Sequence, residues 1–173
     1  MVLALFTTGL LLGGLLSGLV LGALSGLSTP LPAPWRYAAI VAVAAVGLLR
    51  ELGLAPIPLP QNARQIPRDV LQRGLSGSMQ FGFELGTGVR TYVSASAPYV
   101  LAVALLLGGQ RPHVAMLAGI GFGAGRALTP LTRRAAGTGD GWDAELRARL
   151  RALTVTAGAV LLAALSLLAL RQI

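Results

Sequence analysis

The sequence predicts an all-α protein: a polytopic helical membrane protein with about five transmembrane helices and one broken or re-entrant segment. Its 173 residues are 54% hydrophobic and only 12% charged, far more apolar than an ordinary soluble domain. The apolar residues form runs of about 20 residues, long enough for a helix to cross about 30 Å of hydrocarbon. Segments rich in proline or arginine separate these runs. We therefore expect residues 1–173 to form a single integral membrane domain.

The first predicted span covers residues 2–27, within a stretch of 35 residues that carries no charge. A cleaved signal peptide is the alternative. A basic segment before the apolar run and a small-residue cleavage site after it would indicate such a peptide, and the sequence has neither. The span is expected to end at Ser28–Pro34, whose three prolines cannot continue a helix.

The second predicted span covers residues 37–54. It begins beside Trp35, Arg36 and Tyr37, an arrangement typical of the membrane–water interface. Arg50 lies near its end and is expected to reach the interface through its long side chain. Residues 55–75 follow as a polar segment, which we predict to be a cytoplasmic loop.

Residues 77–109 are too many for one straight span, because they would measure about 50 Å as a helix. Gly86, Gly88 and Pro98 can each interrupt a helix. We therefore expect an interfacial or re-entrant segment over residues 76–90, followed by a span over residues 91–109 that is kinked near Pro98. The alternative is a single, strongly tilted helix with a protruding end.

The last two predicted spans cover residues 113–131 and 152–170. The polar residues 132–151 between them form the second predicted cytoplasmic connection. Its end, residues 142–151, has acidic residues early and arginines late, the order that a helix dipole favours.

All 14 basic residues are arginine, and they orient the predicted helices. With the N-terminus in the cytoplasm, eleven arginines lie in cytoplasmic segments or at span ends, while Arg36, Arg111 and Arg171 lie outside. The positive-inside rule therefore predicts a cytoplasmic N-terminus and an external C-terminus in a plasma or bacterial inner membrane. The net charge of +8 is expected to meet anionic lipid headgroups rather than nucleic acid.

Glycines recur at four-residue spacing in several predicted helices. Such spacing gives a helix a small-residue face on which another backbone can approach closely. We expect these faces to pack the spans against each other; the alternative is that they dock a second copy or a partner membrane subunit. The glycines are Gly14, Gly18, Gly22 and Gly26, then Gly82 and Gly86, and finally Gly121 and Gly125.

Glu84 is the acid embedded in an apolar, glycine-rich segment, and ionisable groups inside a membrane are candidates for function. We expect it to pair with Arg90 or Arg126. Pairing with Arg90 requires a break at Gly86 or Gly88, because residues six apart do not share a helix face. Glu84 is thus a candidate substrate or proton site; the alternative is a structural ion pair or an interfacial acid exposed to water.

Hydroxyl groups lie near Pro98, and together with Glu84, Arg90 and Arg126 we predict that they form a polar pathway for a substrate. A broken helix with free backbone groups at membrane depth is typical of transporter binding sites, although a packed proline kink is the alternative. The hydroxyl residues are Thr91, Tyr92, Ser94, Ser96 and Tyr99.

The absence of cysteine excludes disulfides, thiolate metal sites and thiol redox catalysis. His113 is the single histidine, and no arrangement of nucleophile, base and orienting group is visible. We therefore expect no metal site, no cofactor and no enzymatic activity.

Residues 81–107 combine a glycine-rich approach, the motif Ser-x-Ser-x-Pro at Ser94–Pro98 and an aliphatic run. This segment resembles the proline-broken helices of the CcdA/DsbD-type thiol-electron carriers and the related LysE-like exporters. The resemblance implies a small helical membrane fold with a broken helix near its centre. Those electron carriers have paired cysteines beside their prolines, whereas Ala97 and Tyr99 flank Pro98 here, so their redox activity does not carry over.

The expected function is that of a transporter, or a transporter subunit, for a small solute or ion. Five spans are few to enclose a pathway, so we expect a homo-oligomer or a partner membrane subunit. The alternative is a non-catalytic accessory or assembly subunit that docks onto a larger membrane complex through its glycine faces.

Overall fold

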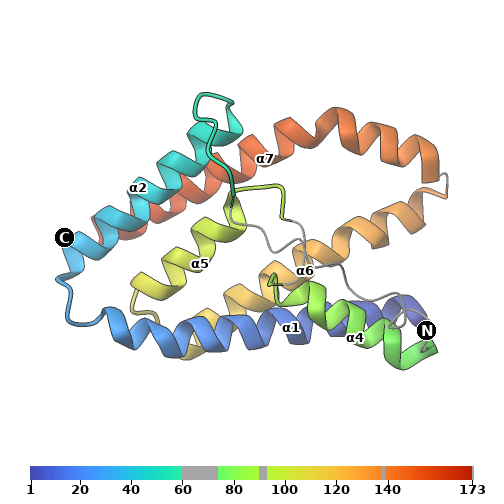
Figure 1. The fold of residues 1–173 in the computed structure, drawn as a ribbon, viewed down its shortest axis with the longest axis horizontal. Coiled ribbons are helices and arrows are strands. Elements are labelled where there is room, and N and C mark those ends of the chain that lie inside the picture. Colours follow the sequence, from blue (N-terminus) through green and yellow to red (C-terminus); the bar gives the residue numbers. More distant parts are fainter. Residues whose placement is uncertain (60–73, 90–92, 138, 173) are drawn as a thin grey trace. The chain divides into compact units, whose positions relative to one another are not determined.

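A computed structural model describes residues 1–59, 74–89, 93–137 and 139–172, and this part of the chain is helical without strands (Figure 1). The predicted all-α class is therefore confirmed. The elements are α1 (Val2–Leu24), the 3₁₀ turn η1 (Ser25–Ser28), α2 (Ala33–Glu51), α4 (Gly74–Gly86), α5 (Ala97–Leu107), α6 (Pro112–Ala136) and α7 (Gly139–Leu170).

Among the described residues, four helices are long and apolar enough to cross a membrane. They are α1 together with η1, α2, α6 and α7. Each of these helices contains a long apolar run. Prolines at the start of α2 and α6 lie in the first turn, where the missing backbone N–H costs no hydrogen bond. The protein thus has the helices of a membrane protein.

The region of the third predicted span differs from the expectation. Its helix, α5, has only 11 residues and measures about 16 Å, roughly half the hydrocarbon thickness. Pro98 lies in the first turn of α5 and does not kink a longer helix. Before this region, the predicted re-entrant segment is helical as α4 up to Gly86, and residues 90–92 lie outside the described part of the chain.

The two polar connections also differ in extent. Helix α6 continues to Ala136 and α7 already begins at Gly139, so most of the connection predicted over residues 132–151 is helical. Gly137 ends α6 in a left-handed conformation with φ of 69°. Helix α2 ends at Glu51 and not near residue 54, and residues 60–73 of the other predicted loop lie outside the described residues.

The chain divides into two compact units. Unit 1 comprises Met1–Val20, Gln61–Tyr92 and Arg111–Leu146, and unit 2 comprises Leu21–Pro60, Val93–Gln110 and Arg147–Ile173. Unit 1 therefore holds most of α1 with α4 and α6, whereas unit 2 holds α2, α5 and most of α7.

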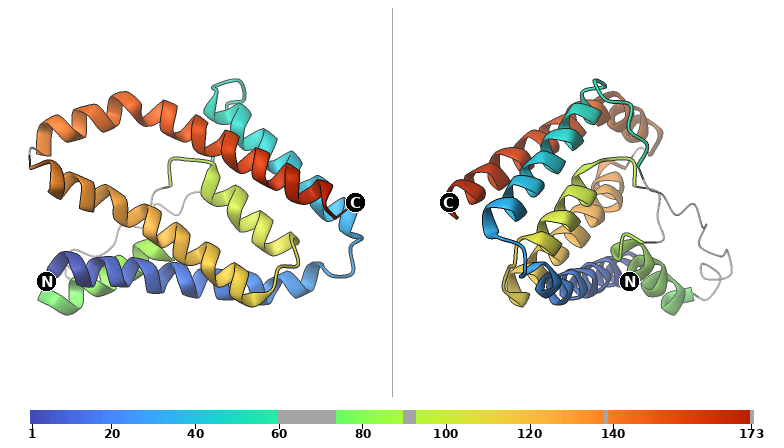
Figure 2. Two further views of the ribbon diagram at one scale, coloured as in Figure 1. Left: turned by 180° about the vertical axis from the view of Figure 1, so that it is seen from behind. Right: turned by 60° about the vertical axis from the view of Figure 1, so that its left-hand side comes forward.

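Unit 1 is built on contacts between helix backbones. A Cβ on Gly9 would lie 2.2 Å from the carbonyl oxygen of Met79, and a Cβ on Gly13 would lie 2.3 Å from that of Phe83. The residue numbers of the contacting pairs increase in the same direction along both helices. Helix α4 therefore runs parallel to α1, alongside its first half (Figure 2).

Helix α6 packs on α1 in the opposite direction. A Cβ on Gly14 would meet the carbonyl oxygen of Gly119 at 2.2 Å, and one on Gly18 would meet that of Ala115 at 2.2 Å. Glycine is needed at both positions because the two backbones touch.

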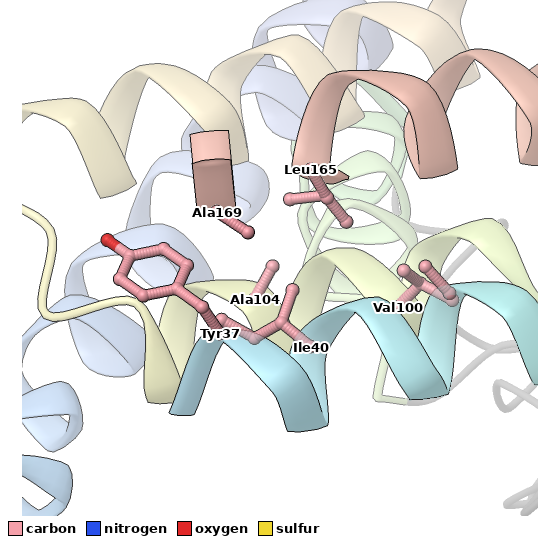
Figure 3. Packing of buried hydrophobic residues seen from close by; sticks show 7 residues of the cluster. Tyr37, Ile40, Val100, Ala104, Leu165 and Ala169 are labelled. Atoms are coloured by element: carbon pink, nitrogen blue, oxygen red, sulfur yellow. The ribbon is translucent and has the colours of Figure 1, made fainter. Parts of the chain in front are cut away.

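Unit 2 is built on side chains. Its core joins α2, α5 and α7, and the side chains of Tyr37 and Ile40 face those of Leu165 and Ala169 (Figure 3). Helix α5 packs against α2 and η1, with Val100 and Ala104 in the same core. The remaining member of the buried core is Ala44.

Candidate functional site

A part-buried carboxylate lies at the start of α5. Glu51 is the last residue of α2, and its side chain is 9% exposed. Its Oε1 atom accepts hydrogen bonds from the backbone N–H of Ser96 at 2.8 Å, from the Ser96 hydroxyl at 2.6 Å and from Nη1 of Arg50 at 2.9 Å. Three donors, one of them charged, therefore converge on one oxygen atom.

The local sequence explains why the carboxylate is needed there. Ser96 precedes the first residue of α5, but its side chain makes no capping bond within the helix. Its hydroxyl donates to Glu51 instead, and the adjacent N–H does the same. A negative charge at this position also interacts favourably with the positive end of the helix dipole. Glu51 thus caps α5 from a different helix.

Arg50 connects the chain segments on either side of this carboxylate. Its Nε donates to the carbonyl oxygen of Ile57 at 2.9 Å, and its Nη1 donates to that of Ser94 at 3.3 Å. The arginine is therefore held by the residues that follow α2 and by those that precede α5.

Helix α7 contributes two further polar groups. The Thr154 hydroxyl lies near the Glu51 carboxylate and donates to the carbonyl oxygen of Arg151 at 3.1 Å. Nη2 of Arg151 donates to the carbonyl oxygen of Leu52 at 3.0 Å, where a cation interacts favourably with the C-terminal end of α2. We refer to Arg50, Glu51, Ser96 and Thr154 as the Glu51 cluster.

The other end of α5 is also held by α2. Nη1 of Arg36 donates to the carbonyl oxygen of Leu107 at 3.3 Å, and the Tyr37 hydroxyl donates to that of Gly108 at 3.2 Å. Helix α2 thus places an acid at the N-terminus of α5 and a base at its C-terminus. Both charges match the helix dipole.

The hydroxyl residues predicted around Pro98 are only partly described. Ser96 belongs to the Glu51 cluster, and Ser94 contributes its backbone carbonyl to Arg50. Tyr99 is half-buried in the first turn of α5, where its N–H donates to the Ser96 carbonyl oxygen at 3.0 Å. The predictions for Thr91 and Tyr92, and that for Arg90, fall outside the described residues.

Glu84 and Arg126 both belong to unit 1. Oε1 of Glu84 accepts a hydrogen bond from Nε2 of Gln80, one helical turn earlier, at 3.1 Å. The Arg126 guanidinium lies over the Phe122 ring, 5.6 Å from its centroid. The expected pairing of Glu84 with Arg90 or Arg126 stays a prediction.

The glycines expected to pack helices occupy different environments. Gly14 and Gly18 contact α6, and Gly82 and Gly86 contact the backbone of α1 at Phe6 and Leu10. Gly22 is buried and its carbonyl oxygen accepts the Ser25 hydroxyl at 2.6 Å.

The remaining three of these glycines have open space around them. Apart from the adjoining residues of the same segment, no atom of the described residues lies within 4 Å of where a Cβ would stand on Gly26, Gly121 or Gly125. In α6 the contacts to α1 are instead made by Gly119 and Gly123. The four-residue spacing of Gly121 and Gly125 is therefore present, but these two glycines lie on another face of the helix.

Glu51 is the functional candidate that the sequence analysis missed. Its position at the end of an apolar run resembles that of an ordinary charged residue at a span end. The available signal was Ser96–Pro98, a typical helix start, whose backbone N–H needs an acceptor if it is buried.

The Glu51 cluster can bind a negative charge. Its donors are a backbone N–H at a helix N-terminus, a hydroxyl and a guanidinium, the groups that proteins use for carboxylates and other oxyanions. Among the described residues, no group of three or more His, Asp or Glu side chains could hold a metal ion.

Comparison with known proteins gives no relative: no protein-family model matches the chain, and no curated protein or solved structure was found to be similar to it. The resemblance of residues 81–107 to the CcdA/DsbD-type and LysE-like proteins therefore stays a prediction.

Proposed function

We propose that this protein is a transporter, or a transporter subunit, for small anions, and that the Glu51 cluster lies in its pathway. The observation that carries the proposal is the convergence of three hydrogen-bond donors on a single oxygen of a part-buried carboxylate. Glu51 is then an anion supplied by the chain itself. A solute anion that displaces its side chain meets the same N–H, hydroxyl and guanidinium.

The short helix beside this cluster supports the proposal. With 11 residues, α5 cannot cross the hydrocarbon by itself, and the described residues 87–89 and 93–96 before it are not helical. Non-helical backbone at membrane depth is tolerated where protein or a water-filled cavity surrounds it, and transporters place binding sites at such breaks.

The membrane topology belongs to the same proposal. We infer a plasma or bacterial inner membrane, a cytoplasmic N-terminus and five crossings, the third of which is made within residues 76–109. The cytoplasmic arginine excess then attracts anions to one face. The small number of spans fits a homo-oligomer or an assembly with a partner subunit.

Cysteine labelling tests this topology. The chain contains no cysteine, so the wild-type protein gives no background labelling by a thiol reagent. Single variants Ala136→Cys and Gln172→Cys place a thiol at the end of α6 and after α7. With five crossings, a membrane-impermeant maleimide labels Gln172→Cys in intact cells and labels Ala136→Cys only after permeabilisation. The opposite pattern contradicts five crossings with a cytoplasmic N-terminus.

A vesicle assay tests transport. Purified protein is reconstituted into vesicles, and swelling is followed by light scattering in potassium chloride, nitrate or acetate with valinomycin present, so that the anion limits the rate. Glu51→Gln removes the competing charge and is expected to raise the flux about tenfold, because a charge-assisted hydrogen bond contributes about 1.5–3 kcal/mol. Ser96→Ala removes a donor and is expected to lower it.

Glu145→Gln is the matched control, since it makes the same chemical change at an exposed residue of α7. It is expected to leave the flux unchanged. If the wild-type protein gives no anion-dependent swelling and Glu51→Gln behaves in the same way, the transport proposal is wrong.

A second candidate function is docking onto a larger membrane complex as a non-catalytic accessory subunit. The open positions at Gly121 and Gly125 favour it, because no neighbouring helix among the described residues packs against them, which leaves small residues of α6 available to a partner. A partner that purifies with the protein in fixed stoichiometry, and is lost in Gly121→Leu without loss of folding, would support this function.

A further inference from the structure

Unit 1 contains a cavity of about 300 Å³ that is open to the surface at the N-terminal end of α1. Its walls come from the first turns of α1, including Phe6, from Ser78 and Phe81 of α4, and from Pro130 and Arg134 of α6. The lining is apolar except for one hydroxyl and one guanidinium.

Two aromatic rings form part of the cavity wall. Glycines bring the backbones of α1 and α4 into contact as far as Phe6, whose carbonyl oxygen lies against Gly82. The rings of Phe6 and Phe81 also meet, with their centroids 5.8 Å apart. Both rings line the cavity and make this part of its wall apolar.

The two polar groups of the lining differ in what they can still bind. The Ser78 hydroxyl already donates to the Gly74 carbonyl oxygen at 3.1 Å. Arg134 is exposed, and among the described residues no carboxylate is paired with it. The neighbouring Arg133, in contrast, pairs with Asp143 at 2.9 Å.

We propose that this cavity binds one anionic phospholipid, with an acyl chain against the apolar walls and the phosphate on Arg134. An apolar cavity with a single guanidinium at its lining complements an amphipathic anion. It lies at the ends of two helices that are long and apolar enough to cross a membrane, which is the level of lipid headgroups. Anionic phospholipids are the amphipathic anions available there.

Native mass spectrometry of the full chain in mild detergent tests the proposal, with dioleoylphosphatidylglycerol or dioleoylphosphatidylcholine added. We expect one phosphatidylglycerol per chain to be retained in preference to phosphatidylcholine. Arg134→Gln is expected to weaken this retention about tenfold, the effect of losing one charge-assisted contact.

Two further variants make the result specific. Arg133→Gln removes the same charge one residue earlier, outside the cavity lining, and is expected to retain the lipid. Ser78→Leu fills the cavity without changing the charge and is expected to expel the lipid. Thermal unfolding in detergent confirms that each variant is folded.

Three outcomes overturn the proposal. Equal loss in Arg133→Gln and Arg134→Gln means general attraction to the positive surface. Wild-type retention in Ser78→Leu means that the acyl chain lies elsewhere. Displacement of phosphatidylglycerol by an equal concentration of oleate means that the ligand is a free fatty acid.

Discussion

Unit 1 and unit 2 hold their helices together in different ways. In unit 1, α1 touches α4 and α6 through backbone atoms at glycines such as Gly9 and Gly14. In unit 2, α2 holds α5 through side chains and through charged groups at both helix ends. Lipid tails are as apolar as leucine, so neither unit can rely on hydrophobic association alone. The comparison indicates that close van der Waals contact and hydrogen bonds to helix ends are two separate solutions to this problem.

The two kinds of packing predict that different substitutions destabilise the protein. Substitution of Gly119 is expected to lower the free energy of unfolding the most. A Cβ on Gly119 would lie 2.1 Å from the carbonyl oxygen of Gly14, so Gly119→Ala must separate two backbones. We expect a loss of about 3 kcal/mol in the free energy of unfolding, at the upper end for overpacking. Unfolding by sodium dodecyl sulfate, followed by circular dichroism, measures it.

Gly121→Ala is the control on the same helix, because no atom lies within 4 Å of the added Cβ. Alanine is the better helix former, so this variant is expected to gain about 0.5 kcal/mol. Equal effects of the two substitutions would contradict backbone packing between α1 and α6.

The end groups of α5 give the next largest effect. Glu51→Ala leaves the Ser96 N–H and hydroxyl without their acceptor, and we expect a loss of about 2 kcal/mol in the free energy of unfolding. The same detergent titration measures it, with Glu145→Ala as the exposed control. A stability equal to that of the control would show that Glu51 does not hold α5.

The opposite end of α5 gives the smallest effect. Arg36 has one hydrogen bond of 3.3 Å to the Leu107 carbonyl oxygen, which is longer than the bonds of Glu51. Arg36→Gln is therefore expected to cost about 1 kcal/mol or less, mainly through its interaction with the helix dipole. Arg171→Gln, a charge change at an exposed residue beyond α7, provides the reference. A loss larger than that of Glu51→Ala would reverse the expected order.

Sequence alone predicts the apolar parts of the long helices because these parts are long apolar runs, as in Val2–Leu24, but it misses that α6 continues through a charged segment to Ala136 and that α7 begins as early as Gly139. It predicts α5 less well. Residues 91–110 are all uncharged, so hydropathy extends the helix in both directions, whereas Pro98 favours a first-turn position and the helix begins at Ala97.

The candidate site was predictable only in part. Ser96 was found through its position beside Pro98, but its acceptor Glu51 is 45 residues away in the chain, and no local pattern links the two. The sequence also does not determine which face of α6 packs against α1, because the answer depends on a helix far away in the chain. Gly119 and Gly123 have the same spacing as Gly121 and Gly125, so only the neighbouring helix decides which pair is covered.

The brevity of α5 has a consequence for biosynthesis. A segment of 11 residues is too short to be inserted as an independent span when it leaves the ribosome. Its end groups need partners in the membrane, and these are Glu51 and Arg36 on α2, which is translated earlier. We expect co-translational insertion of α5 to fail when α2 is replaced by a polyleucine helix of equal length, which glycosylation mapping of residues 108–111 would detect. Unchanged glycosylation would refute this dependence. If insertion of α5 does depend on α2, the two helices assemble in unit 2 in the order in which they are translated.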